Sequence, residues 1–144
     1  MESLLVNWLG IMRGEQHLTK RRQYTLVYRE GRSWVSGLVV MKALPNGLAL
    51  SRYGFSVTRQ VGGSVTRNRV KRLLREILRL TPLESGWDII FIVRPVAATA
   101  SYAELKQSVM KLLSQAGLLK ALGNNLGGFR AGASGGLGLI SQIV

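Results

Sequence analysis

Side chains able to carry out acid–base, nucleophilic or metal chemistry are scarce in this chain. His17 is the only histidine among 144 residues, cysteine is absent, and the seven acidic residues stand singly. A lone histidine can assemble neither a catalytic triad nor a zinc site, and we expect His17 to be a surface or capping residue. The sequence therefore predicts no catalytic side chain, and no metal or cofactor held by the protein itself.

Cationic side chains, in contrast, gather on one predicted helix, residues 62–80. Its apolar residues recur at the spacing of a single helix stripe: Val70, Leu73, Leu74, Ile77 and Leu78. Residues nearly opposite that stripe, or on its flanks, are polar or cationic: Asn68, Arg69, Lys71, Arg72, Arg75 and Arg79. Arg67 falls nearer the apolar edge, so we expect it to point back toward the body of the protein. The pattern predicts one face packed on a core and one face offered to an anionic partner.

The net charge of +13 is concentrated in one part of the chain. Residues 17–81 hold fourteen Lys and Arg against Glu30 and Glu76, whereas the remainder is close to neutral. Such an excess is typical of proteins that bind a polyanion. Nucleic acid is the first candidate and an anionic membrane the second. A membrane-surface helix needs a free apolar face, and here the predicted strands require that face for a core.

A first helix is expected from a cap at Thr19 to about Glu30. Tyr24 and Tyr28 are one turn apart and therefore lie on the same side of it. Two roles are open for this pair from the pattern alone. Either both rings belong to the core with their hydroxyls at its edge, or they stack on single-stranded bases.

Strands are expected at residues 34–44, with a break at Gly37 allowed, and at residues 52–58 and 88–94. The last of these is continuously apolar, which is typical of a central strand covered on both faces. A Ser and Glu capping box opens a final helix over residues 101–117. This order of elements predicts an α+β sandwich with a small mixed or antiparallel sheet.

One domain is expected from a length of 144 residues with 47% hydrophobic content. We place it at residues 17–119. Residues 1–16 are expected to be an N-terminal extension, either disordered or preceding a true start at Met12, and residues 120–144 a glycine-rich flexible tail. No basic stretch precedes the first apolar run, so a signal peptide is not expected. The absence of cysteine suits a reducing compartment, and we expect a cytoplasmic protein.

A specific motif lies in the basic helix and in the segment before it. Residues 54–59 read GFSVTR, and residues 67–76 read RNRVKRLLRE. These residues resemble the signature of the bacterial ribonuclease P protein component, and the similarity covers about residues 16–119. The resemblance implies a two-layer α-β sandwich in the order α-β-β-β-α-β-α, with a small mixed sheet. It also implies a left-handed crossover through the helix of the RNR motif, against the general right-handed preference.

The resemblance further implies a function and partners. The protein would be the RNA-binding subunit of a ribonucleoprotein endonuclease whose RNA removes the 5′ leader of precursor tRNA. It would bind the leader and stabilise the complex of RNA and substrate, while the partner RNA would require Mg²⁺. The expected partners are ribonuclease P RNA and the precursor tRNA leader, without stable membrane association. The alternative is a generic RNA-binding or ribosome-associated α+β protein with no role in tRNA processing.

Two sets of residues match the functional positions of that family. The set implied to face the RNA comprises Arg67, Asn68, Arg69, Lys71, Arg72 and Arg75. The set implied to line a leader-binding cleft, between the first helix and the sheet, comprises Tyr24, Tyr28, Lys42, Ser56, Thr58 and Arg59. Guanidinium groups suit phosphates because they stay charged and donate in a fixed fork, and the resemblance favours base stacking for the two tyrosines.

Two positions depart from the family pattern. Lys42 stands where the family often has an aromatic residue, and Gln60 stands where a second basic residue commonly follows Arg59. We therefore expect a more electrostatic contact with the leader at Lys42 and a weaker contact at Gln60.

Overall fold

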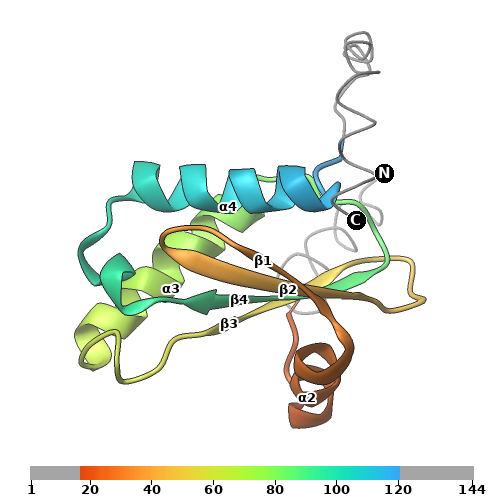
Figure 1. The fold of residues 1–144 in the computed structure, drawn as a ribbon, viewed down its shortest axis with the longest axis horizontal. Helices are drawn as coiled ribbons and strands as arrows, with labels where there is room; N and C mark the ends of the chain where they lie inside the picture. Colours follow the sequence, from red (N-terminus) through yellow and green to blue (C-terminus); the bar gives the residue numbers. More distant parts are fainter. Residues whose placement is uncertain (1–16, 121–144) are drawn as a thin grey trace, which may run out of the picture.

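The computed structural model describes residues 17–120 (Figure 1). Its elements are α2 (Arg21–Glu30), β1 (Arg32–Val35), β2 (Val39–Pro45), β3 (Arg52–Ser56), α3 (Ser64–Arg79), β4 (Trp87–Val93), the 3₁₀ helix η2 (Pro95–Thr99) and α4 (Tyr102–Ala116). The predicted extension at residues 1–16, and the predicted tail after Lys120, lie outside the described residues.

The four strands form one mixed sheet in the order β1-β2-β4-β3. Strand β2 runs antiparallel to both β1 and β4, whereas β3 runs parallel to β4. The α+β class, the element order and the mixed sheet confirm the predicted fold. The hand of the crossover from β3 through α3 to β4 stays a prediction.

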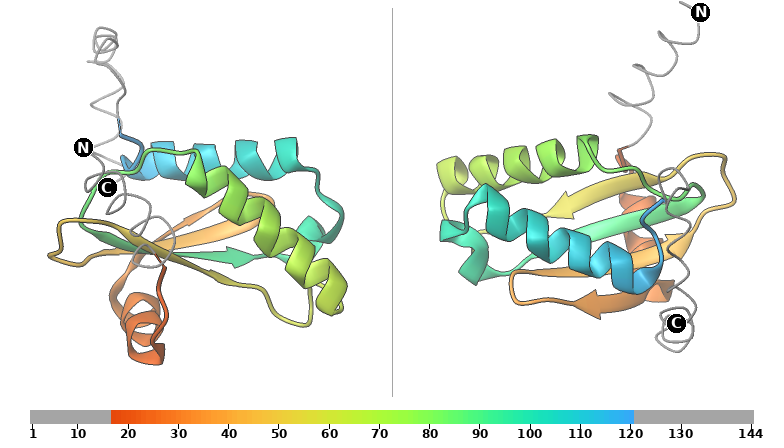
Figure 2. Two further views of the ribbon diagram at one scale, coloured as in Figure 1. Left: turned by 180° about the vertical axis from the view of Figure 1, so that it is seen from behind. Right: turned by 90° about the horizontal axis from the view of Figure 1, so that it is seen from above.

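Helices α3 and α4 cover one face of the sheet, and α2 lies against part of the other (Figures 1 and 2). The larger core cluster joins alternate residues of the strands, such as Met41 and Phe91, to Leu74 of α3 and Leu112 of α4. A smaller cluster lies under α2, where Val27 packs against Leu18 and Ile90. Because α2 has only ten residues, much of this second face is left for other contacts.

The predicted central strand is confirmed. Strand β4 lies between β2 and β3, and Ile89, Ile90 and Phe91 are fully buried. The break at Gly37 is also confirmed, because β1 ends at Val35 and β2 begins at Val39. The predicted capping box of α4 is present as well, with Ser101 and Glu104 each accepting from the other's backbone N–H.

Several predicted boundaries are wrong by one or two residues, among them those of α2 and β3. Helix α2 begins at Arg21, with Lys20 rather than Thr19 at its N-cap. The carboxamide oxygen of Gln23 accepts from the N–H groups of Thr19 and Lys20 at 3.1 and 3.0 Å. Strand β3 ends at Ser56 rather than Thr58. The carbonyl of Thr58 instead closes a turn by accepting from the N–H of Val61 at 3.0 Å.

His17 and the end of the described chain are both tied to the fold. His17 forms a parallel bridge with Tyr53, and the N–H of Leu18 donates to the Tyr53 carbonyl at 2.9 Å. The residue therefore extends the sheet beyond β3 and is neither a cap nor a freely exposed side chain, which corrects the expectation. At the other end, Leu118 is buried, and the N–H of Lys120 donates to the Pro82 carbonyl at 3.0 Å.

Candidate nucleic-acid interface

Two rows of side chains cross the sheet on the face that α2 partly covers. The strand register places Ser33, Lys42, Ile90 and Gly54 in one row, and Val35, Val40, Ile92 and Ser56 in the next. Only Ile90 and Gly54 are buried among these, and Val35 is 60% exposed. The face thus combines apolar and hydroxyl groups with one lysine.

Tyr24 and Tyr28 take different positions although they share one side of α2. Tyr24 is half-buried, its hydroxyl donates to the Leu18 carbonyl at 3.3 Å, and its ring lies directly over Gly54. Burial, and secondarily the neighbouring Tyr28, raises the pKa of Tyr24. The Tyr28 side chain is 41% exposed. Tyr24 therefore packs on the sheet, and Tyr28 presents an available ring.

The other residues of the predicted cleft divide between this face and a nearby turn. The ammonium of Lys42 donates to the Ser33 hydroxyl of β1 at 2.8 Å, and Ser56 lies in the adjacent row two strands away. Thr58 and Arg59 are exposed in the turn that follows β3. We call Tyr24, Tyr28, Lys42 and Ser56 the α2-side surface.

Helix α3 presents the predicted cationic face to solvent. Asn68, Arg72 and Arg75 are exposed, Lys71 is half-buried, and the apolar stripe packs into the core. We call Asn68, Arg72 and Arg75 the α3 surface. Because Glu76 is already paired with Arg79 at 2.6 Å, the charge of Arg72 and Arg75 stays available to an anion.

Arg67 and Arg69 use their guanidinium groups within the protein. Arg67 donates from Nε to the Gly62 carbonyl at 3.1 Å, which agrees with the expectation that it points back toward the body. Arg69 donates to the carbonyls of Ala98 at 3.2 Å and Ala100 at 2.7 Å. It therefore joins α3 to the segment that leads into α4, a role that the helical pattern does not reveal.

A buried ion pair that sequence reasoning missed fixes β3 against β4. Asp88 is only 5% exposed, and it accepts from Arg52 at 2.8 and 2.7 Å in a bidentate pair and from the Asn46 amide at 2.8 Å. The hydrogen bond to Asp88 raises the pKa of Arg52. Arg52 is therefore a structural cation rather than a candidate for RNA contact.

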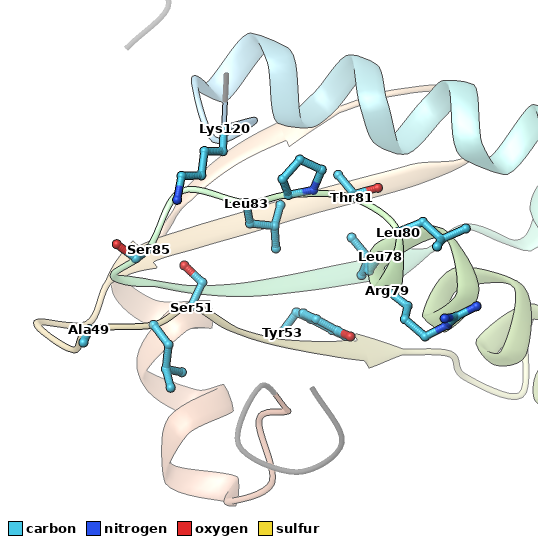
Figure 3. A pocket seen from close by; sticks show the side chains of 12 residues that line it. Ala49, Ser51, Tyr53, Leu78, Arg79, Leu80, Thr81, Leu83, Ser85 and Lys120 are labelled. Atoms are coloured by element: carbon cyan, nitrogen blue, oxygen red, sulfur yellow. The ribbon is translucent and has the colours of Figure 1, made fainter. Parts of the chain in front are cut away.

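A hollow of about 490 Å³ lies beside the C-terminal end of α3 (Figure 3). Its walls include Tyr53, Leu78 and Leu83, while Arg79 and Lys120 stand toward its two ends. Arg79 is engaged with Glu76, so this hollow contains less available positive charge than the exposed α3 surface.

Together, the fold and its basic helix define an α+β protein with a cationic surface suited to a polyanion. Within residues 17–120, no helix is both long enough and apolar enough to cross a bilayer. In the same residues, no group of three or more His, Asp or Glu side chains is placed to hold a metal ion.

Comparison with known proteins gives the family. The family model for ribonuclease P matches residues 12–117, and the chain belongs to this family. It is 50% identical over 108 residues to the ribonuclease P protein component of Dehalococcoides mccartyi, covering 75% of this chain and 90% of that protein. The corresponding protein of a Roseiflexus species is 41% identical over 113 residues, with 76% and 93% covered.

Solved structures agree with this assignment. The RNase P protein from Thermotoga maritima matches with a TM-score of 0.62 and 30% identity, covering 69% of this chain and 96% of that one. A mutant RNase P protein of Staphylococcus aureus has the same fold, with a TM-score of 0.71 at 24% identity, covering 78% and 98%. Family and fold support the predicted role of an RNA-binding subunit in tRNA processing.

Proposed function

We propose that this chain is the protein subunit of ribonuclease P, that it docks on the RNA subunit through the α3 surface, and that it binds the 5′ leader of precursor tRNA on the α2-side surface. The observation that carries this proposal is that the two surfaces lie on opposite faces of the sheet (Figures 1 and 2). Exposed cations lie on α3, and an exposed aromatic ring with a lysine lies across the sheet.

Each surface has the chemistry that its partner requires. Arg72 and Arg75 suit a folded RNA because guanidinium groups neutralise backbone phosphates and release counterions. Tyr28 suits a single strand because any base can stack on an exposed ring, and Lys42 adds a cation between β1 and β4. The leader is single-stranded, so the α2-side surface is the better match for it.

Hydrolysis belongs to the RNA subunit in this proposal, and the Mg²⁺ that it requires is held by RNA rather than by protein side chains. Four of the five acidic residues within 17–120 support this division. Asp88 and Glu76 are paired with arginines, Glu30 lies 3.5 Å from Arg29, and Glu104 caps α4. A cytoplasmic location follows from a role in tRNA maturation.

Reconstitution with the cognate ribonuclease P RNA tests the proposal. We expect the protein alone to cleave nothing, and the holoenzyme to bind precursor tRNA more tightly than mature tRNA and to need less Mg²⁺ than the RNA alone. Asn68→Ala/Arg72→Ala is the better probe of docking than a change at Arg67 or Arg69, because those two arginines also hold backbone carbonyls.

The two surfaces should respond differently. The double variant on α3 is expected to weaken assembly with the RNA, whereas Tyr28→Ala is expected to reduce the preference for precursor tRNA about tenfold, one stacked base contributing about 1–3 kcal/mol, with assembly intact. Equal affinity of the wild-type holoenzyme for precursor and mature tRNA would instead indicate a generic RNA-binding protein.

A further inference from the structure

A second hollow, of about 270 Å³, lies at the outer edge of β3, where His17 bridges to Tyr53. It is bounded by the segment that leads into α2, by α2 itself, by β3 and by α3. Its titratable and hydroxyl-bearing lining residues are His17, Thr19, Tyr24, Tyr53, Lys71 and Arg75. We call it the β3-edge hollow. It is the place where the α3 surface and the α2-side surface meet, since Arg75 belongs to the first and Tyr24 to the second.

The β3-edge hollow is lined by donors and cations from two sides. Lys71 and Arg75 are one helical turn apart on α3, so both side chains reach the same side. The hydroxyl of Thr19 comes from the segment before α2, whereas the hydroxyl of Tyr24 already donates to the Leu18 carbonyl. None of the acidic residues within 17–120 lines this hollow. An anion entering it would therefore meet positive charge and a hydroxyl donor without a nearby carboxylate.

The pKa of His17 is affected by burial and by the charged residue Arg75, which also lines this hollow. The His17 ring stands edge-on to Tyr53 with 5.0 Å between centroids. Burial, followed by the positive charge of Arg75, lowers the pKa of His17 below its ordinary value of 6.5. The other titratable groups that line the hollow are Lys71, Tyr24 and Tyr53. Near neutral pH the imidazole is therefore uncharged, and it can both donate and accept a hydrogen bond.

We propose that the β3-edge hollow binds a backbone phosphate of the precursor tRNA leader, at the point where the leader crosses from the α2-side surface toward the RNA subunit docked on α3. Arg75 and Lys71 hold the phosphate from α3, the hydroxyl of Thr19 donates to it from the segment before α2, and the ring of Tyr24 forms part of the wall. This inference rests on the proposed function, because it assigns a path to the leader between two surfaces already argued to bind RNA.

His17 provides a direct measurement, because the chain contains no other histidine and its imidazole C–H signals in an NMR spectrum are unique. We expect the pKa of His17 in the full-length protein to rise by about one unit when a short single-stranded leader RNA is added, since a nearby anion favours the charged imidazole. A pKa that stays unchanged while the RNA is bound would overturn the inference.

Arg75→Ala and Arg72→Ala form a matched pair of variants. Both remove one exposed arginine from α3, but only Arg75 lines the hollow. We expect Arg75→Ala to raise the pKa of His17 in the free protein and to abolish most of the further rise on adding RNA. Arg72→Ala should preserve the RNA-induced rise, even where overall affinity falls. Equal effects of the two variants would contradict a specific phosphate contact.

One further sample, and one further outcome of the leader RNA experiment, separate this inference from its alternatives. Inorganic phosphate, at the concentration of RNA phosphate, should leave the pKa of His17 almost unchanged, and an equal rise would assign the hollow to free phosphate instead of RNA. Failure of the leader RNA to bind at all would contradict the proposed function, whereas binding without a response of His17 contradicts only the crossing point.

Discussion

The phenol of Tyr24 occupies the space that a side chain at Gly54 would need. A Cβ built on Gly54 would overlap the hydroxyl of Tyr24 and crowd its ring. Helix α2 is thus seated on β3 through a direct contact between an aromatic ring and bare backbone. A glycine inside a strand often marks such a close approach, and here it allows helix α2 to lie close to the sheet.

Gly54→Ala should therefore displace Tyr24 and loosen α2. We expect a loss of about 1–2 kcal/mol in the free energy of unfolding, the usual range for overpacking, measured by urea denaturation. Gly37→Ala is the matched control, because nothing lies within 4 Å of a Cβ at that position. Equal stability of the two variants would show that the contact between Tyr24 and Gly54 adapts without cost.

Arg69→Ala should destabilise the protein as well as weaken RNA binding. The change leaves the carbonyls of Ala98 and Ala100 without the guanidinium donor, and the expected cost is about 1–3 kcal/mol. Arg69→Lys should recover little of it, since a single ammonium cannot reproduce a fork to two carbonyls. Urea denaturation should show almost no change for Arg72→Ala, and a similar stability of all three variants would exclude this role.

Asp88→Asn should destabilise the sheet by about 1–3 kcal/mol, because the bidentate pair with Arg52 is lost within a mostly buried site. Glu76→Gln is the control, since its pair with Arg79 is exposed and such pairs contribute about 0–1 kcal/mol. Thermal and urea unfolding of both variants check the expectation. A larger effect at Glu76 would reverse this ranking of the two ion pairs.

Stability should fall on mild acidification through His17. Its pKa is lower in the folded protein than the ordinary 6.5, so the unfolded chain binds the proton more readily. The stabilisation by the neutral imidazole is therefore fully present above pH 6.5, the ordinary pKa. It is lost as the pH falls below 6.5 and through the lower pKa of the folded protein. His17→Gln should remove the part of this pH dependence that sets in as the pH falls below about 6.5. Parallel stability curves for wild type and variant would contradict it.

Local sequence patterns predicted those features of the fold that depend on residues close together in the chain. The apolar stripe of α3, the continuous core of β4 and the capping box of α4 are local patterns, and each is found in the structure. The exposure of Asn68, Arg72 and Arg75 followed from the same helical geometry. Local spacing was sufficient for these features because their partners lie within the same element or on a single face.

The missed features depend on residues far apart in the sequence. Arg69 looked like its exposed neighbours, but its acceptors lie 29 and 31 residues away. The pair of Arg52 and Asp88 spans 36 residues, and His17 meets Tyr53 only because the chain before α2 joins the edge of the sheet. Gly54 carried a usable signal, since a glycine inside a strand suggests close packing.

The register of strand β3 determines which of its side chains face the larger core and which face the side where RNA is expected. Its alternate residues serve opposite sides: Tyr53 and Phe55 belong to the larger core, while Gly54 and Ser56 face α2. A slip of one residue would exchange these two sets, placing aromatic rings where RNA is expected and a serine in the core. Because Asp88 pairs with Arg52 at the first residue of the strand, this ion pair holds β3 in the register on which the α2-side surface depends.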